Sequence, residues 1–191
     1  MAIRLIGRLL RPVRAGIGRT AWFDPAVQHA PETLTVGSAA FADGADIPRL
    51  HAGTGVGDNV SPPLHWSGVP VEAVELVLII EDPDAPLRRP VVHGVFTGID
   101  PRITSVPEGA LGSNDGETGS RFRVGTGSFG RRGYAGPRPV PGHGPHRYVF
   151  QFLALDQPSG LTDGATLPAV LAAVTGHVIA RGRLTGRYER P

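Results

Sequence analysis

The stretch that most constrains the fold of this chain is residues 133–150, which read GYAGPRPVPGHGPHRYVF. Residues 133–145 hold four glycines and four prolines. This density excludes a helix or a regular inner strand, because proline lacks an amide donor and glycine loses conformational entropy when ordered. Alternating residues then predict a strand over residues 146–155. Because side chains two apart on a strand share a face, His146 and Tyr148 are expected to lie side by side at the mouth of the space that the sheet encloses.

The composition of the chain favours one β-rich domain. Its 191 residues suffice for a substantial core, and 27 glycines with 19 prolines indicate many turns between short strands. The chain has no cysteine, and all 19 of its basic residues are arginine, which excludes disulfides, thiolate chemistry and a Schiff-base lysine. No apolar run is long enough to span a membrane as a helix.

The charge of the chain is divided unevenly between its start and the remainder. The first 23 residues carry five arginines and no acid, whereas the rest carries 14 arginines against 17 acids. We therefore predict a basic amphipathic N-terminal arm over residues 1–30 and a single domain over residues 31–191. No nucleic-acid partner is expected, because the domain itself is not basic.

Residues 1–14 of this arm have a nearly helical apolar period. The apolar members of the pattern are Ile3, Leu5, Ile6, Leu9, Leu10 and Val13. One interpretation is a helix that packs on the domain or on a second subunit, giving a homodimer. Another is a helix that makes peripheral contact with a membrane surface. A secretion signal is the weakest interpretation, because arginines interrupt the apolar region. Without such a signal, a cytoplasmic location is expected.

Further elements follow from apolar patterns along the chain. Strands are predicted over residues 34–36, 39–41, 73–81, 91–99 and 183–188, and one helix over residues 166–180. Residues 100–132 are rich in glycine and are predicted to be irregular, either as a mobile segment or as a flap.

The predicted strand 73–81 leads into the segment DPDAP, residues 82–86. Two carboxylates held by two prolines at the end of a buried strand indicate a site, because binding residues are usually carried by loops on a rigid scaffold. The structural alternative is an Asp-Pro turn whose carboxylates accept local amides. His93, on the next predicted strand, has the same two interpretations, a core residue or a site residue.

Together these segments resemble the phosphatidylethanolamine-binding protein family, in its bacterial Raf-kinase-inhibitor-like branch. The resemblance is carried by EDPDAP at residues 81–86, by His93, and by GYAGPRPVPGHGPHRYVFQFLALD at residues 133–156. With NVSPPLHWSGVP at residues 59–70 and GHVIARGRLTGRYER at residues 176–190, it covers about residues 34–190. It implies a mainly β fold, a phosphatidylethanolamine-binding-protein-like β-sandwich with a few peripheral helices.

The resemblance also implies a small anion pocket at the ends of the central strands. By position, its ligand-binding residues would be Asp82, His93, His146, Tyr148, Gly136 and Pro139. Both histidines are expected to donate to the anion. The Asp82 carboxylate is expected to orient one of them and to keep it protonated.

Other residues are expected to shape this pocket. Asp84 and Pro86 would form its wall, and Arg147 would buttress the loop by pairing with Asp84. The resemblance implies a cis peptide bond between Ala85 and Pro86. Gly94 stands where the family usually has an aromatic residue, which predicts a wider pocket.

We therefore predict a protein that binds a small anion, such as phosphate, a phospholipid headgroup or a phosphorylated group, and that regulates signalling through its ligand or a partner. The alternative is an enzyme that uses the histidine, aspartate and tyrosine side chains for acid–base or metal-assisted hydrolysis. Binding is favoured over catalysis, because the chain lacks cysteine, lysine and a GxSxG motif. No cofactor and no metal site is predicted.

Overall fold

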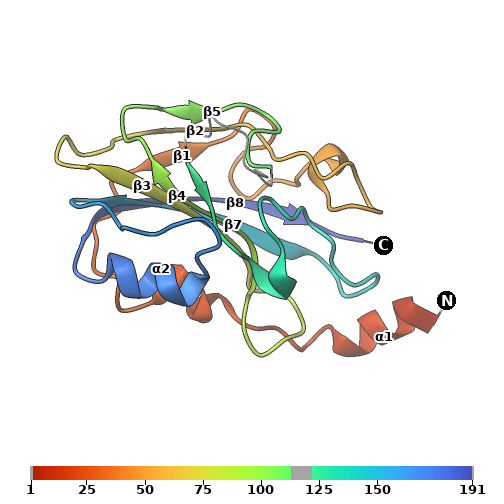
Figure 1. The fold of residues 1–191 in the computed structure, drawn as a ribbon. Coiled ribbons are helices and arrows are strands. Elements are labelled where there is room, and N and C mark those ends of the chain that lie inside the picture. The colour runs from red at the N-terminus through yellow and green to blue at the C-terminus, as the bar shows by residue number, and fades with distance from the viewer. Residues whose placement is uncertain (1, 113–121, 191) are drawn as a thin grey trace.

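The computed structural model describes residues 2–112 and 122–190, which form two antiparallel sheets (Figure 1). The smaller sheet has the order β1-β2-β5, with β1 at Thr35–Gly37, β2 at Leu64–Ser67 and β5 at Ser105–Val106. The larger sheet has the order β6-β4-β3-β7-β8. Its strands are β3 (Glu75–Asp82), β4 (Val91–Ile99), β6 (Arg123–Val124), β7 (His146–Leu155) and β8 (Val178–Tyr188).

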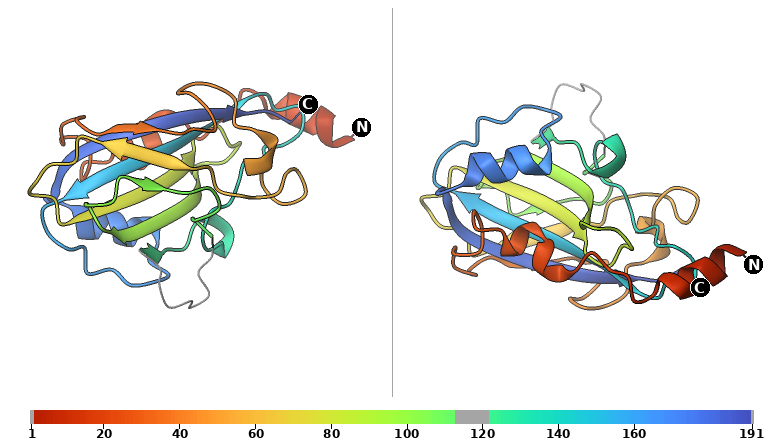
Figure 2. Two further views of the ribbon diagram at one scale, coloured as in Figure 1. Left: turned by 90° about the horizontal axis from the view of Figure 1, so that it is seen from above. Right: turned by 90° about the horizontal axis from the view of Figure 1, so that it is seen from below.

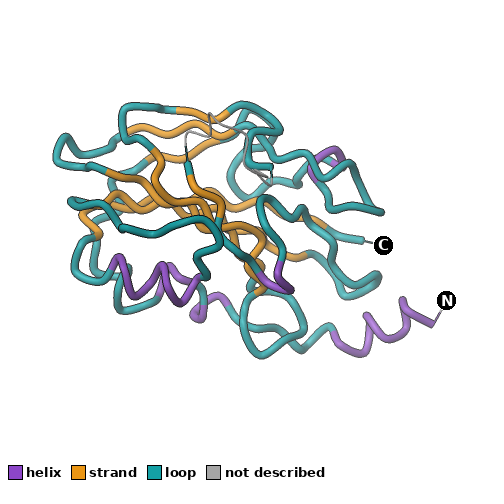
Figure 3. The backbone as a smooth tube through the Cα atoms, viewed as in Figure 1, coloured by secondary structure: helices purple, strands orange, loops and turns teal. Residues whose placement is uncertain are grey.

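Helices are few in the described part of the chain (Figure 3). The two α-helices are α1 (Ala2–Leu10) and α2 (Leu167–Val174), and short 3₁₀ turns lie at Ile17–Arg19, Ala21–Phe23, Arg49–His51 and Ser128–Gly130. Among residues 2–112 and 122–190, no helix is long and apolar enough to cross a membrane. The prediction of a mainly β fold with a few helices is confirmed.

Two hydrophobic cores hold the layers together. The first lies between the sheets, where the rings of Trp66 on β2 and Phe152 on β7 are 4.6 Å apart. The second covers the other face of the large sheet, where α2 and the segment containing Ala21 and Val27 pack (Figure 2). Strand β3 is therefore buried on both faces, which explains its unbroken apolar run. The predicted boundary at residue 30 stays a prediction, although residues 21 and 27 already pack with the body.

The patterned strands were predicted well and one helix was not. Strands 91–99 and 146–155 have the predicted bounds. The predicted helix 166–180 is wrong beyond Val174, because Gly176 adopts a left-handed conformation (φ 82°) and the chain enters β8 at Val178. The final strand is accordingly longer than predicted. Residues 39–41 form no strand, since Ser38 Oγ accepts the Ala40 amide in a bend.

Four strand ends meet at one end of the large sheet. Asp82, the last residue of β3, pairs with Val91 at the start of β4, and His146 at the start of β7 pairs with Tyr188 at the end of β8. The loops that follow or precede these ends are those singled out in the sequence. Helix α1 extends from the same end of the molecule (Figure 1). This end therefore carries the candidate site. Part of the predicted flap, residues 113–121, lies outside the described residues.

Candidate functional site

The predicted aspartate and histidine of the site meet at the end of strands β3 and β7. Asp82 Oδ2 lies 2.8 Å from His146 Nδ1, and both side chains are buried. Asp82 Oδ1 also accepts the amides of Asp84 at 2.8 Å and Ala85 at 3.1 Å. The carboxylate thus caps its own turn, as the structural alternative expected, and orients a histidine, as the resemblance expected.

A second histidine that the sequence did not single out extends this contact. His143 Nδ1 lies 2.7 Å from His146 Nε2. The other ring nitrogen of His143 donates to the carbonyl oxygens of Leu10 at 2.9 Å and Val13 at 3.2 Å. The residues form a continuous hydrogen-bonded path from the N-terminal arm to Asp82.

This path needs one proton more than two neutral imidazoles carry. One hydrogen is required between His143 and the carbonyls, one between the two rings, and one between His146 and Asp82. Two neutral rings supply only two of these three. Burial and the charge of His146 lower the pKa of His143, so His143 is the neutral ring. The third hydrogen therefore belongs to the Asp82–His146 pair, where the carboxyl group and the imidazole share it.

The contacts of His146 correct one feature of the predicted anion pocket. Both ring nitrogens are occupied by protein, by Asp82 on one side and His143 on the other. In this arrangement His146 has no nitrogen left to donate to a ligand. Its role as a ligand-binding residue stays a prediction that requires His143 to move.

Asp84 forms the second buried contact of the cluster, as predicted. Arg147 binds it through Nε at 2.7 Å and Nη2 at 2.8 Å, and the Arg147 amide adds a third bond at 2.9 Å. Arg14 of the arm adds an ion pair of 3.0 Å. Burial would raise the pKa of Asp84, but the hydrogen bonds of Arg147 and Arg14 outweigh it and lower the pKa to about 2.

His93 and Tyr148 lie next to each other on neighbouring faces of the cluster. Their rings meet edge to face with centroids 5.0 Å apart. The Nδ1 of His93 donates to the carbonyl oxygen of Ala135, which leaves Nε2 as the free nitrogen. Burial lowers the pKa of His93; Asp82 and the Ala135 carbonyl oppose this, and Arg131 adds to it. His93 is therefore neutral at neutral pH.

The hydroxyl of Tyr148 is a buried polar group without a hydrogen-bond partner in the described chain. Burial raises the pKa of Tyr148 well above its ordinary value, so the group is a neutral donor. The backbone of Arg138 faces the hydroxyl and opposes part of this rise, although it forms no hydrogen bond of good geometry. An unpaired buried hydroxyl is costly, and an oxygen of a ligand would satisfy it.

The remaining predicted residues lie around this cluster. The Gly136 amide donates to Asn59 Oδ1 at 2.8 Å, and a side chain at Gly136 would collide with the His51 carbonyl oxygen, 2.2 Å from its Cβ. The carbonyl oxygen of Pro139 accepts a long bond of 3.4 Å from Arg190. Pro86 is half-buried in the loop after β3.

Two finer predictions about this pocket are wrong. The described residues contain no cis peptide bond, so Ala85–Pro86 is trans. The Ala85 carbonyl is held by the amides of Ala15 at 3.0 Å and Leu87 at 2.8 Å, which fixes the turn in this form. Gly94 does not widen the pocket, because a Cβ there would lie 2.8 Å from the Phe96 ring, which fills that space.

The N-terminal arm is seated on the loops of the cluster. A Cβ at Gly7 would lie 2.0 Å from the Pro141 carbonyl oxygen, and one at Gly142 would lie 2.8 Å from the Arg4 carbonyl oxygen. Only glycine permits this approach of helix α1 to the loop. Arg11 Nε then donates to the Gly142 carbonyl at 2.9 Å.

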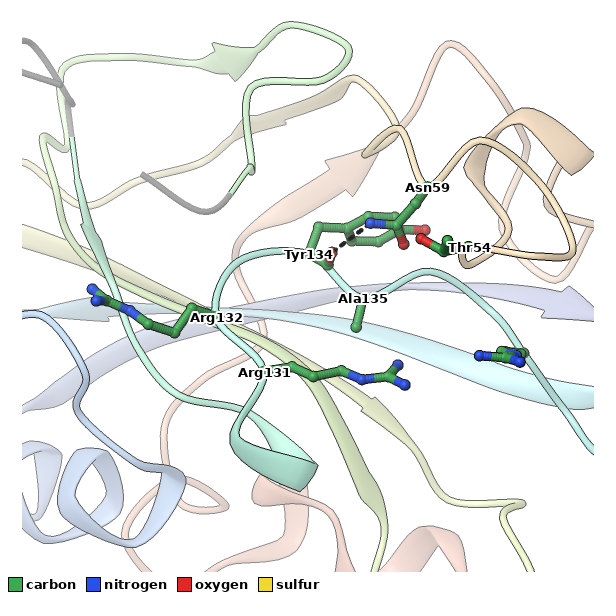
Figure 4. A pocket seen from close by; sticks show the side chains of 7 residues that line it. Thr54, Asn59, Arg131, Arg132, Tyr134 and Ala135 are labelled. Carbon is green, nitrogen blue, oxygen red and sulfur yellow. Dashed lines mark hydrogen bonds between the residues drawn. The ribbon is translucent and has the colours of Figure 1, made fainter. Parts of the chain in front are cut away.

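An open cavity of about 310 Å³ adjoins the cluster (Figure 4). Its lining consists of Thr54, Asn59, Arg131, Arg132, Tyr134, Ala135 and Arg138. Ala135 connects it to the cluster, because its carbonyl binds His93. Arg131 connects it as well, because its charge acts on the same ring.

The cavity has a positive lining that is partly fixed in place. Three arginines and no carboxylate line it among the described residues. Asn59 is held on both sides, since its Nδ2 donates to the Tyr134 carbonyl at 3.2 Å and its Oδ1 accepts the Gly136 amide. Figure 4 shows Arg131 extending beneath Ala135, whereas the Arg132 side chain points away from Ala135.

The residues of this cavity were not predicted from the sequence. The Arg131–Arg132 pair directly before the glycine–proline stretch was a signal that could have indicated them.

A metal centre is not indicated by this geometry. Within residues 2–112 and 122–190, no three histidine, aspartate or glutamate side chains are grouped so that they could hold a metal ion. Asp82 and His146, which are closest to such a set, are saturated by each other and by their neighbours.

The fold and this site define the class of protein. A family model described as phosphatidylethanolamine-binding protein matches residues 37–189, so the chain belongs to that family, as predicted. The crystal structure of a phosphatidylethanolamine-binding protein homologue from Chlamydia trachomatis is 33% identical and has a TM-score of 0.73, covering 84% of this chain and 99% of that one. YbcL of Escherichia coli is 28% identical with a TM-score of 0.76, covering 83% and 99%.

A curated relative adds a point about location. A protein of Mycobacterium tuberculosis that carries the lipoprotein name LppC is 39% identical over 164 residues, which is 84% of this chain and 74% of LppC. Because this relative is named as a lipoprotein, the predicted cytoplasmic location of this chain stays a prediction.

Proposed function

We propose that this protein binds a small phosphate-type anion, as free phosphate or as the phosphate of a headgroup or a phosphorylated group, in the cavity beside His93. The observation that carries the proposal is a lining that includes Arg131 and Arg138 and, among the described residues, no carboxylate. Guanidinium groups bind phosphate oxygens through paired, charge-assisted hydrogen bonds. A cavity of about 310 Å³ fits a ligand of that size.

The cluster behind the cavity supports the same proposal. The unpaired Tyr148 hydroxyl is a neutral donor that lies near the backbone of Arg138. Asp82 and Asp84 do not repel an anion strongly, because Asp82 shares a proton with His146 and Asp84 forms an ion pair with the half-buried Arg147.

The test is a titration followed by calorimetry and by the ring resonances of His93. Inorganic phosphate, phosphorylethanolamine and acetate are compared for the wild type and for Arg138→Ala. We expect saturable binding of the phosphate ligands, weakened about tenfold or more by Arg138→Ala, because a charge-assisted hydrogen bond contributes about 1.5–3 kcal/mol. Tighter binding of phosphorylethanolamine than of phosphate would assign the site to a headgroup.

The matched control is Arg102→Ala. Arg102 is an exposed arginine that pairs with Asp100 after β4, away from the cavity lining. Equal weakening by Arg102→Ala would reduce the effect to overall charge. Absence of binding at millimolar phosphate would overturn the proposal.

A role in regulating signalling is included in the proposal only as a consequence of binding such a ligand. The enzymatic alternative gains no support from this geometry, because His146 is enclosed by Asp82 and His143 and only the Nε2 of His93 is left as a base.

A further inference from the structure

Helix α1 is docked on the body through backbone atoms rather than through its apolar side chains. It contacts the body at Gly7, which packs on the carbonyl of Pro141, and through the carbonyl groups of Arg4 and Leu10. Leu5 and Leu9 are each two positions from Gly7, about 200° around the helix, and so lie on the opposite side. They are exposed by 61% and 71%. The side chains of these two leucines thus point away from the protein to which the helix is attached.

The exposed surface of α1 is amphipathic. Its exposed apolar members are Ile3, Leu5, Ile6 and Leu9, followed by Val13 just beyond the helix. Arg4 and Arg8, four residues apart, lie beside them, and Arg11, whose Nε donates to the Gly142 carbonyl, follows just after the helix. No acidic residue lies in residues 2–23. Such a distribution is typical of helices that lie in the headgroup layer of a bilayer.

The position of α1 suits a flat partner. The helix stands clear of the sheets at the end that carries the candidate site (Figure 1), and Figure 2 shows this from two further sides. Residues 87–89, exposed in the adjoining β3–β4 loop, add one leucine and two arginines. This loop is tied to the arm by the bonds from Ala15 to Ala85 and from Gly16 to Pro83. These bonds hold the loop against the segment that follows α1.

We infer that α1 binds an anionic lipid surface, with its leucine and isoleucine side chains among the acyl chains and its arginines among the lipid phosphates. A second copy of the chain is the weaker occupant, since facing copies of α1 would bring like charges together with no acid on the helix to offset them. A nine-residue helix also offers less than the roughly 800 Å² that each partner buries in a stable protein interface. Lipid binding does not depend on the proposed cavity ligand.

The test measures co-sedimentation of the full chain, tagged at its C-terminus, with vesicles of phosphatidylcholine alone or with a third of phosphatidylglycerol. The wild type is expected to bind the anionic vesicles and to be released by high salt. The double variant Leu5→Glu/Leu9→Glu is expected to lose at least about tenfold in partition, because it removes apolar burial and adds repulsion from the surface. Both side chains are exposed, so the fold is unaffected.

The matched control is Val71→Glu, which changes a valine that is 93% exposed outside the arm. Its vesicle binding should fall much less than that of the double variant. Failure of the wild type to bind anionic vesicles, or undiminished binding by Leu5→Glu/Leu9→Glu, would overturn the inference. So would a dimer in solution without lipid that the double variant dissociates, since that result assigns the face to a second copy.

Discussion

Two regions at the same end of the large sheet treat charge in opposite ways. In the buried cluster, His146 and two amides bind Asp82, and Arg147 binds Asp84 through its guanidinium and its amide. In the adjoining cavity, Arg131 and Arg138 are exposed and have no carboxylate partner among the described residues. The difference separates groups that hold the fold from groups that are free to meet a ligand.

The same contrast explains why the residues that looked most functional in the sequence are the most enclosed. A buried charge is tolerated only when it is paired and hydrogen-bonded. The cluster meets that requirement from within, through Arg147, His143 and the arm. The arginines of the cavity are exposed, so they need no partner within the fold and can bind an anion. Disruption of the cluster should therefore cost stability, whereas disruption of the cavity should cost affinity.

The largest expected effect is the loss of Asp82. The variant Asp82→Ala removes three accepted hydrogen bonds and leaves the buried Nδ1 of His146 without its partner. Breaking a buried pair by removing one member costs about 3–5 kcal/mol of unfolding free energy. Urea denaturation followed by tryptophan fluorescence measures this loss.

The control for this variant is Asp100→Ala, which removes a surface partner of Arg102. An exposed ion pair stabilises little, so its denaturation midpoint should hardly move. A comparable shift in both variants would show that the Asp82 contacts do not hold this end of the sheet.

The next effect is a dependence of stability on pH through Asp84. Its pKa is lowered from 3.8 to about 2 in the folded protein, so the stabilisation is complete above pH 4 and is lost as the pH falls through 2. The free energy of unfolding of the wild type should exceed that of Asp84→Asn by about 2 kcal/mol at pH 7, and this difference should fall toward zero as the pH approaches 2. Denaturation curves at several pH values measure the gap.

The Asp84 prediction is contradicted if the gap is independent of pH, because the carboxylate would then contribute through its shape alone. The arm takes part in this pair through Arg14. Protection of residues 2–14 from proteolysis should therefore weaken in parallel with the stability of Asp84→Asn.

The fold was predictable where one local pattern had a single meaning. Strands 91–99 and 146–155 are continuous apolar or alternating runs, and they formed as expected. Residues 178–180 are equally apolar as the end of a helix or the start of a strand. Pairing of β8 along the length of β7, together with the left-handed Gly176, decided that case. No local pattern contains that information.

The paired side chains of the site were predictable from the sequence, but the residues that enclose them were not. The Arg147–Asp84 pair and the Asp82–His146 contact follow from which strand ends meet. His143 was missed, because it lies in a loop without periodicity and its partners Leu10 and Val13 are about 130 residues away in the chain. Arg131 was missed because it falls in the irregular segment before the glycine–proline stretch.

The smallest expected effect tests whether the two regions are coupled. The positive charge of Arg131 is one of the causes that lower the pKa of His93, after burial. The variant Arg131→Gln should therefore raise the pKa of His93, and bound phosphate should raise it in the wild type by offsetting the same charge. Arg132→Gln is the matched control, since the Arg132 side chain points away from Ala135 (Figure 4). Titration of the His93 ring by NMR measures all three cases. If Arg131→Gln and Arg132→Gln shift the pKa equally, the cavity acts on the cluster through overall charge alone, and if phosphate leaves the pKa unchanged, its binding site lies elsewhere.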